Sequence, residues 1–147
     1  KSSGKWYWEG SFASGGSGST SVAIGIASNN YSDANAPDFS NIDGQAVIAS
    51  NGISYVDGGN SSAAPNYSAG TTLQFFLDFD NDIFEVAQAG GARYTLVPSL
   101  IAIGTEWRPF VVSSYGTTNR VEIQLNASGF EYAIPAGYSS LDGVVSS

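Results

Sequence analysis

The segment Thr71–Ala87, TTLQFFLDFDNDIFEVA, has the most regular pattern of apolar residues in the chain. One side of an extended strand here would carry Leu73, Phe75, Leu77 and Phe79, and the other side Gln74, Phe76, Asp78 and Asp80. Alternation with a period of two predicts a β-strand with one buried face. Asn81-Asp82 then interrupts the pattern, and these residue types suit tight turns because they tolerate left-handed backbone. The segment therefore predicts a β-hairpin in the core of the domain.

The composition of the whole chain fits an all-β domain. Its 147 residues suffice for one domain with a substantial core, and 13% of them are aromatic. Glycine and serine are abundant and the sequence has no long helix-forming run, which favours many strands and turns. No run approaches the roughly 18 apolar residues of a membrane helix, so we expect no membrane insertion. The chain starts at Lys1 and contains no methionine, so we expect a processed protein or a segment of a longer one.

The net charge and the absence of cysteine and histidine exclude several classes of function. The net charge is −8, and the five cations are scattered along the sequence. Nucleic-acid binders need clustered cations to neutralise phosphates, so we expect no nucleic-acid partner. The chain has no cysteine, which excludes disulfides, zinc–thiolate sites and cysteine nucleophiles. It has no histidine either, which excludes a Ser-His-Asp triad.

Two strands are expected before the hairpin. Gly4–Glu9, GKWYWE, alternates its tryptophans with Tyr7 and Glu9, and Ser21–Ala27, SVAIGIA, alternates branched with small residues. The small residues would let a neighbouring layer approach closely. Together these strands resemble the opening of a SPRY domain. The FFLDFD strand, Trp107–Ser113 and the ending Val121–Tyr132 resemble later pieces of that family, in its order.

This resemblance runs from Gly4 to about Pro135, although Val86 and Ala89 depart from the family's usual residues. It implies an antiparallel β-sandwich, SPRY-like and related to the concanavalin-type jelly roll, over residues 1–135. Short strands are also expected at Ala46–Ala49, Ile53–Val56 and Arg93–Val97, and a second hairpin at Val111–Tyr115 with Val121–Leu125.

The polar loops are the candidate binding regions. Ser28–Gly44 has no periodicity, and a loop of this length in a compact domain is often functional, although a merely solvated insertion is an open alternative. Tyrosine and amide side chains are adaptable contacts. The candidate ligand-binding residues of these loops and their borders are Tyr31, Asp33, Asn35, Tyr55, Asp57, Tyr67 and Trp107. In peptide-binding SPRY proteins an aromatic–glycine pair lines the pocket, and the resemblance implies that role for Tyr115 and Gly116.

The acids Asp78, Asp80 and Asp82 admit three interpretations. They could supply oxygen ligands to calcium, although the chain lacks the glycine and glutamate of an EF-hand loop at the required positions. Asp78 and Asp80 would also share a strand face, about 6.5–7 Å apart, within reach of a glycosidase carboxylate pair. We favour the third interpretation, a polar hairpin end, and therefore expect no catalytic residue.

The loops are rich in aromatic and amide side chains, and the sequence offers no set of catalytic residues. This combination predicts a non-catalytic recognition module. Pro135–Leu141, PAGYSSL, resembles a segment that follows SPRY-like modules in phage appendage proteins, so residues 136–147 are expected to leave the domain. The first interpretation is a phage tail-fibre or bacterial appendage module, on the virion or outside the cell. It would bind a host cell-surface glycan or protein, or an adjacent structural protein, and a homotrimer would suit it. The alternatives are an intracellular peptide-binding adaptor domain and, less favoured, a jelly-roll glycan hydrolase.

Overall fold

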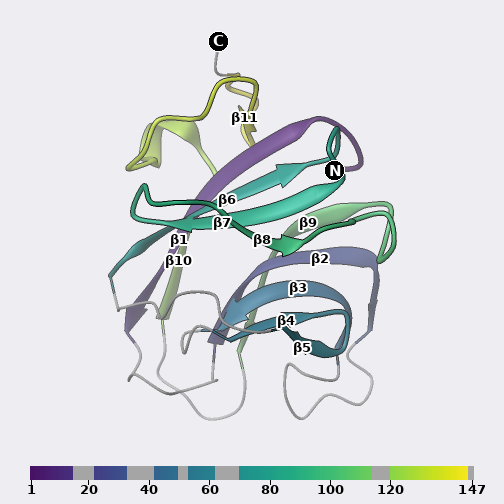
Figure 1. The fold of residues 1–147 in the computed structure, drawn as a ribbon. Coiled ribbons are helices and arrows are strands. Elements are labelled where there is room, and N and C mark those ends of the chain that lie inside the picture. The colour runs from purple at the N-terminus through teal and green to yellow at the C-terminus, as the bar shows by residue number, and fades with distance from the viewer. Residues whose placement is uncertain (15–21, 33–41, 50–52, 62–69, 114–119, 146–147) are drawn as a thin grey trace.

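The computed structural model describes residues 1–14, 22–32, 42–49, 53–61, 70–113 and 120–145, which form two sheets packed face to face (Figure 1). The first sheet has the order β10-β1-β6-β7-β8, with β11 beside β1. Its strands are β1 (Lys5–Ser14), β6 (Thr72–Asp78), β7 (Ile83–Gln88), β8 (Tyr94–Val97), β10 (Arg120–Gln124) and β11 (Ser139–Ser140).

The second sheet has the order β5-β4-β3-β2-β9. Its strands are β2 (Val22–Ser32), β3 (Asp43–Ala49), β4 (Ser54–Val56), β5 (Gly59–Ser61) and β9 (Trp107–Ser113). Neighbouring strands run antiparallel, except for the short parallel pairing of β1 with β11. The expected all-β sandwich of two antiparallel sheets is confirmed.

The predicted central hairpin is the core hairpin of the first sheet. β6 and β7 pair from Leu73 with Gln88 to Asp78 with Ile83, and a tight turn joins them. Trp8 of β1 stacks on Phe75 and Phe84, with ring centroids 5.3 and 5.8 Å away. Each large side chain buried in this layer contributes about 1.5–3 kcal/mol to stability.

The expectation that β6 buries only one face is wrong. Gln74, Phe76 and Asp78 on its other face are also buried. The chain after β10 covers them, because Tyr138 packs edge-on against Phe76, with 5.8 Å between centroids, and Phe130 belongs to the same cluster. The segment that was expected to leave the domain at residue 136 thus lies against the first sheet and adds β11 to it.

A buried carboxylate fastens this C-terminal cover to the sheet. Glu9 accepts hydrogen bonds from the Tyr7 hydroxyl at 2.6 Å and from the backbone N–H groups of Glu131 and Tyr132 at 2.7 and 2.9 Å. Burial first, and then the bond to Glu9, raises the pKa of Tyr7, so this hydroxyl stays protonated and donates. Three donors offset the cost of burying the Glu9 carboxylate.

The predicted second hairpin, Val111–Tyr115 with Val121–Leu125, is wrong. β9 pairs with β2 in the second sheet, whereas β10 pairs with β1 in the first. Both segments alternate polar and apolar residues, and this pattern is the same for two strands of a hairpin as for two strands that face each other across the core. The chain therefore changes sheets between β9 and β10.

Candidate functional site

A pocket of about 340 Å³ opens at one end of the sandwich, among segments that lie at the right-hand end in Figure 1. Three segments form it: the residues before β1, the β6–β7 turn, and the loop from Pro98 to Glu106 between β8 and β9. The lining residues are Ser2, Phe79, Asp82, Leu100, Ile101, Gly104 and Thr105. This volume lies at the lower end of the range, roughly 300–1,000 Å³, of small-molecule sites.

Asp82 holds the β8–β9 loop against the β6–β7 turn. Its carboxylate accepts hydrogen bonds from Ser99 Oγ at 2.6 Å and from the Ile101 N–H at 2.8 Å, and its carbonyl accepts one from the Leu100 N–H at 3.0 Å. The bond from Ser99, followed by the backbone bonds, lowers the pKa of Asp82 despite partial desolvation. The carboxylate that lines the pocket is therefore ionised at neutral pH.

The end of β2 supports the loop from the second sheet. Asn29 Oδ1 accepts hydrogen bonds from the N–H groups of Thr105 and Glu106 at 3.1 and 3.2 Å, and Asn30 Nδ2 donates to the Ile103 carbonyl at 2.8 Å. These bonds connect the two sheets at the pocket. The pocket is thus framed by polar contacts on both sides rather than by a free loop.

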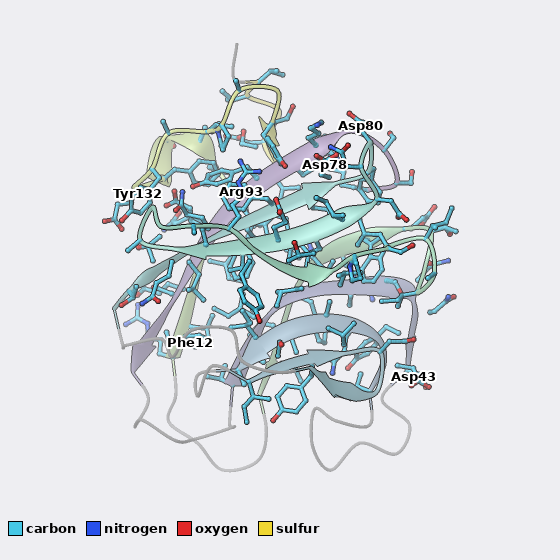
Figure 2. The ribbon with its side chains drawn as sticks, in the orientation of Figure 1. Phe12, Asp43, Asp78, Asp80, Arg93 and Tyr132 are labelled. Carbon is cyan, nitrogen blue, oxygen red and sulfur yellow. The ribbon has the colours of Figure 1, made fainter. Side chains whose placement is uncertain are left out.

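Tyr31 and Asp57, which were predicted as contacts, lie at this same end. Tyr31 follows Asn30 directly, and its backbone lies close to Gly44, because a Cβ added to Gly44 would be 2.5 Å from the Tyr31 nitrogen. Gly44 in turn donates its N–H to Asp57 Oδ1 at 2.9 Å. We call the pocket together with Asn29–Tyr31 and Asp57 the pocket end. Figure 2 shows Asp80 of the first sheet and Asp43 of the second at this end as well.

The remaining predicted contacts are distributed differently. Trp107 is 1% exposed, belongs to the core, and donates its indole N–H to the Gly104 carbonyl at 3.2 Å, so its ring supports the pocket loop and offers no ligand face. Tyr55 is buried in an apolar cluster on the outer face of the second sheet, which Tyr31 and Phe110 also join. The other predicted contacts, Asp33, Asn35, Tyr67, Tyr115 and Gly116, lie outside the described residues.

Sequence reasoning missed the pocket lining. The apolar run Leu100–Ile103 stands out in the polar loop Pro98–Glu106, and such a run favours burial. Leu100 is buried, but Ile101 is 72% exposed at the pocket. A short apolar run in the loop between two strands was the available signal. The partners that make it a pocket come from distant segments, so the run alone could not reveal the site.

The three acids of the hairpin do not converge on a common point. Asp78 Oδ1 accepts the N–H groups of Asp80 and Asn81, both at 3.0 Å, and its Oδ2 accepts Asn81 Nδ2 at 2.8 Å and pairs with Lys5 Nζ at 3.0 Å. Asp82 instead binds the β8–β9 loop. Among the described residues, no group of three or more acidic, histidine or cysteine side chains is placed to hold a metal ion.

The environment of Asp78 is that of a structural group. Burial alone would raise its pKa, but the hydrogen bonds from Asn81 and Lys5 outweigh burial, and the pKa of Asp78 is lowered. A general acid of a glycosidase needs a raised pKa and access to a substrate. Asp78 is 3% exposed and has neither property, so it fixes the turn.

The geometry defines a β-sandwich with a pocket framed by end loops. No protein-family model matches the sequence, and a search of curated protein sequences found no match. Among solved structures, the SPRY domain of human HERC1 is similar, with a TM-score of 0.66 at 16% sequence identity, covering 84% of this chain and 76% of that chain. The chain therefore has the fold of a SPRY domain, as the resemblance predicted. None of its described segments is a helix long and apolar enough to cross a membrane.

Proposed function

We propose that this protein is a non-catalytic recognition module and that its pocket end binds a protein partner. The observation that carries the proposal is the pocket itself, which is formed by end segments of a rigid sandwich. Ile101 and Phe79 supply apolar surface, while Asp82 and Thr105 supply polar groups. Binding sites combine these features in this way, with apolar lining and a few placed polar groups. The likeness of fold to a SPRY domain supports a binding role.

The contacts of the hairpin acids argue against the glycan hydrolase. The carboxylate pair that the sequence suggested would consist of Asp78 and Asp80. Because Asp78 is buried and uses both oxygens on Lys5, Asn81 and the turn backbone, it is not aimed at a groove. We therefore assign the acids to the stability of the hairpin end.

We place the module in a phage tail fibre or bacterial appendage, on the virion or otherwise outside the cell. The cysteine-free sequence, its abundance of glycine and serine and its net charge of −8 support this setting. The resemblance of Pro135–Leu141 to the corresponding segment of phage appendage proteins also supports it. The partner would be a host surface protein or glycan, or an adjacent structural protein, and the module would serve as part of a homotrimer.

An intracellular adaptor domain that binds a short peptide is the second candidate. It is favoured by the similarity of fold to the SPRY domain of a human protein, HERC1. The sequence that flanks the domain in the full gene product distinguishes the two settings. Fibre-like repeats or a trimerisation segment would favour the appendage, and a RING or coiled-coil neighbour would favour the adaptor.

The proposal is tested by the binding of the fluorescently labelled chain to host cells and to an array of candidate partner proteins. Ile101→Asp places a charge in the pocket wall, and we expect binding to fall at least about tenfold, because an apolar contact is replaced by a desolvated charge. Leu125→Asp is the matched control, since Leu125 is an exposed aliphatic residue beyond β10 at the opposite edge of the first sheet. Equal binding by the two folded variants would refute the pocket end as the binding surface.

A further inference from the structure

The pocket combines an apolar floor with a single charged wall. Leu100 is 1% exposed and Phe79 is packed against the core, so both are fixed. Ile101 stands beside them as an exposed aliphatic side chain. An isolated exposed aliphatic residue is common on protein surfaces. Here it extends the apolar lining of a cavity.

The charged wall is the carboxylate of Asp82. It accepts one hydrogen bond on each oxygen, from the Ile101 N–H and from Ser99 Oγ. A carboxylate has about four lone-pair sites, so it can accept further donors from a ligand. The backbone of Asp82 is left-handed, with φ of 60°, and the bonds to the loop keep the side chain in place. The acceptor is therefore preorganised before any ligand arrives.

Asp82 forms no ion pair with a lysine or arginine side chain among the described residues. The ion pairs of the described part of the chain are Lys5–Asp78, Arg93–Glu85 and Arg120–Glu122, and Asp82 belongs to none of them. The chain as a whole carries a net charge of −8. Electrostatic complementarity at an interface therefore calls for a positive group on the partner at this position.

We propose that the pocket receives the side chain of a lysine or arginine residue from a protein partner. The aliphatic stem would lie on Phe79 and Ile101, above the buried Leu100, and the cationic head would bind the Asp82 carboxylate. Lysine and arginine are the side chains that join an apolar stem to a charged head, which matches the two parts of the pocket. This inference rests on the proposed function, because it names the chemistry that the pocket end recognises.

The test uses n-pentylammonium as a probe for the side chain and 1-pentanol as its uncharged counterpart. Amide chemical shifts of Ile101 and Thr105 are followed by NMR during titration of the 147-residue chain. We expect saturable shifts with n-pentylammonium, and an affinity about tenfold or more above that of 1-pentanol, because a hydrogen bond to a charged group is added. Equal affinities for the two probes would overturn the proposal.

Asp82→Asn removes the charge and keeps the shape, and asparagine is among the residues that tolerate left-handed backbone. We expect it to weaken n-pentylammonium about tenfold or more and to leave 1-pentanol unchanged. Asp80→Asn, which makes the same change of charge at an exposed neighbour, is the control and should match the wild type. Ile101→Ala, which leaves the carboxylate in place, should weaken both probes together. Undiminished n-pentylammonium binding in either Asp82→Asn or Ile101→Ala would refute the assignment.

Two further arms separate this inference from its alternatives and from the proposed function. Calcium ions that move the same amides at lower concentration than n-pentylammonium would show a metal site and overturn the proposal. Tighter binding of glucosamine than of n-pentylammonium would overturn it in favour of a glycan. Full partner binding by Asp82→Asn would refute the pocket chemistry alone, whereas partner binding that is insensitive to Ile101→Asp would refute the proposed function.

Discussion

At the scale of single residues, one glycine sets the distance between two strands. Gly25 of β2 lies opposite Val47 of β3, and a Cβ at this position would be 2.0 Å from the Ala46 carbonyl oxygen and 2.7 Å from the Val47 Cα. The small residues of this strand were expected to admit a neighbouring layer. The close neighbour is instead the adjacent strand of the same sheet.

Gly25→Ala should therefore be strongly destabilising. The added methyl group meets backbone, which cannot move aside as a flexible side chain can, so we expect the free energy of unfolding to fall by about 1–3 kcal/mol or more. Urea denaturation measures the change. Gly137→Ala is an informative comparison because it has open space around its Cβ and only the cost of a positive φ of 82°. A loss from Gly25→Ala no larger than that from Gly137→Ala would contradict the steric argument.

Asp78 makes stability depend on pH in the acid range. Its pKa in the folded chain is below the ordinary value of 3.8, so folding is favoured by its ionisation above that value, and this contribution is lost as the pH falls through the folded pKa. Asp78→Asn should lower the free energy of unfolding at pH 7 by about 2 kcal/mol, since charge-assisted hydrogen bonds are lost.

The difference between wild type and Asp78→Asn should shrink below about pH 4, as the wild-type carboxyl becomes protonated. Denaturation curves at pH 7 and pH 3 measure both quantities. Asp80→Asn has the same change in charge at an exposed position and should show little of either effect. A pH-independent difference for Asp78→Asn would mean that burial rather than ionisation governs its contribution.

At the scale of elements, the segment after β10 is a cover for the first sheet. Its aromatic side chains Phe130 and Tyr138 pack on aromatic rings of the sheet. Arg93 adds a cationic contact: its guanidinium lies 3.9 Å from the Phe76 ring centroid and donates a hydrogen bond to Tyr138 Oη at 3.3 Å. Figure 2 shows Arg93 between the sheet and this segment. Such stacking of a cation on aromatic rings adds to the burial of their faces.

Glu9 makes the polar contacts that attach this cover to the sheet. Its replacement should therefore destabilise the cover more than it destabilises the two sheets. Glu9→Ala leaves the N–H groups of Glu131 and Tyr132 without their acceptor, and an unsatisfied buried donor costs about 1–3 kcal/mol. We expect faster hydrogen exchange at these two amides and at Ser140 of β11. Exchange in β2 and β3 should change little. Uniformly faster exchange across both sheets would show that Glu9 supports the whole fold instead.

At the scale of the whole molecule, the order of recognisable strands was enough to predict the sandwich. The strands that alternate cleanly, such as Thr72–Asp78, lie where the pattern places them. The separation of β9 from β10 could not be predicted, since alternation does not say which sheet a strand joins. The C-terminal cover escaped prediction because Phe130, Ile134 and Tyr138 lie in a stretch with Pro135 and Gly137 that forms neither a long strand nor a helix, so strand and helix patterns give no sign of its burial.

The position of the candidate site could be predicted less completely than the fold. Tyr31 and Asp57 were chosen for their loop chemistry, and they lie at the pocket end, but Trp107 was chosen for its ring and lies in the core. The pocket joins residues from near Ser2, Asp82 and Ile101, and only the packing of the two sheets brings them together. A site made of segments far apart in the sequence has no local signature, so its discovery required the structure.

The central position of β1 in its sheet affects how the chain can fold while it is being synthesised. β1 leaves the ribosome before the other strands of the described residues, yet its neighbours in the sheet are β6, from the middle of these residues, and β10 and β11, from near their end. Until β10 emerges, one edge of β1 has no partner strand, and the Glu9 carboxylate gains the N–H groups of Glu131 and Tyr132 only after that. Pairings between such distant segments slow folding and leave aggregation-prone edges exposed. A nascent chain that stalls before residue 120 would therefore keep this edge of β1 open to other chains, whereas a chain synthesised past Ser140 can close it.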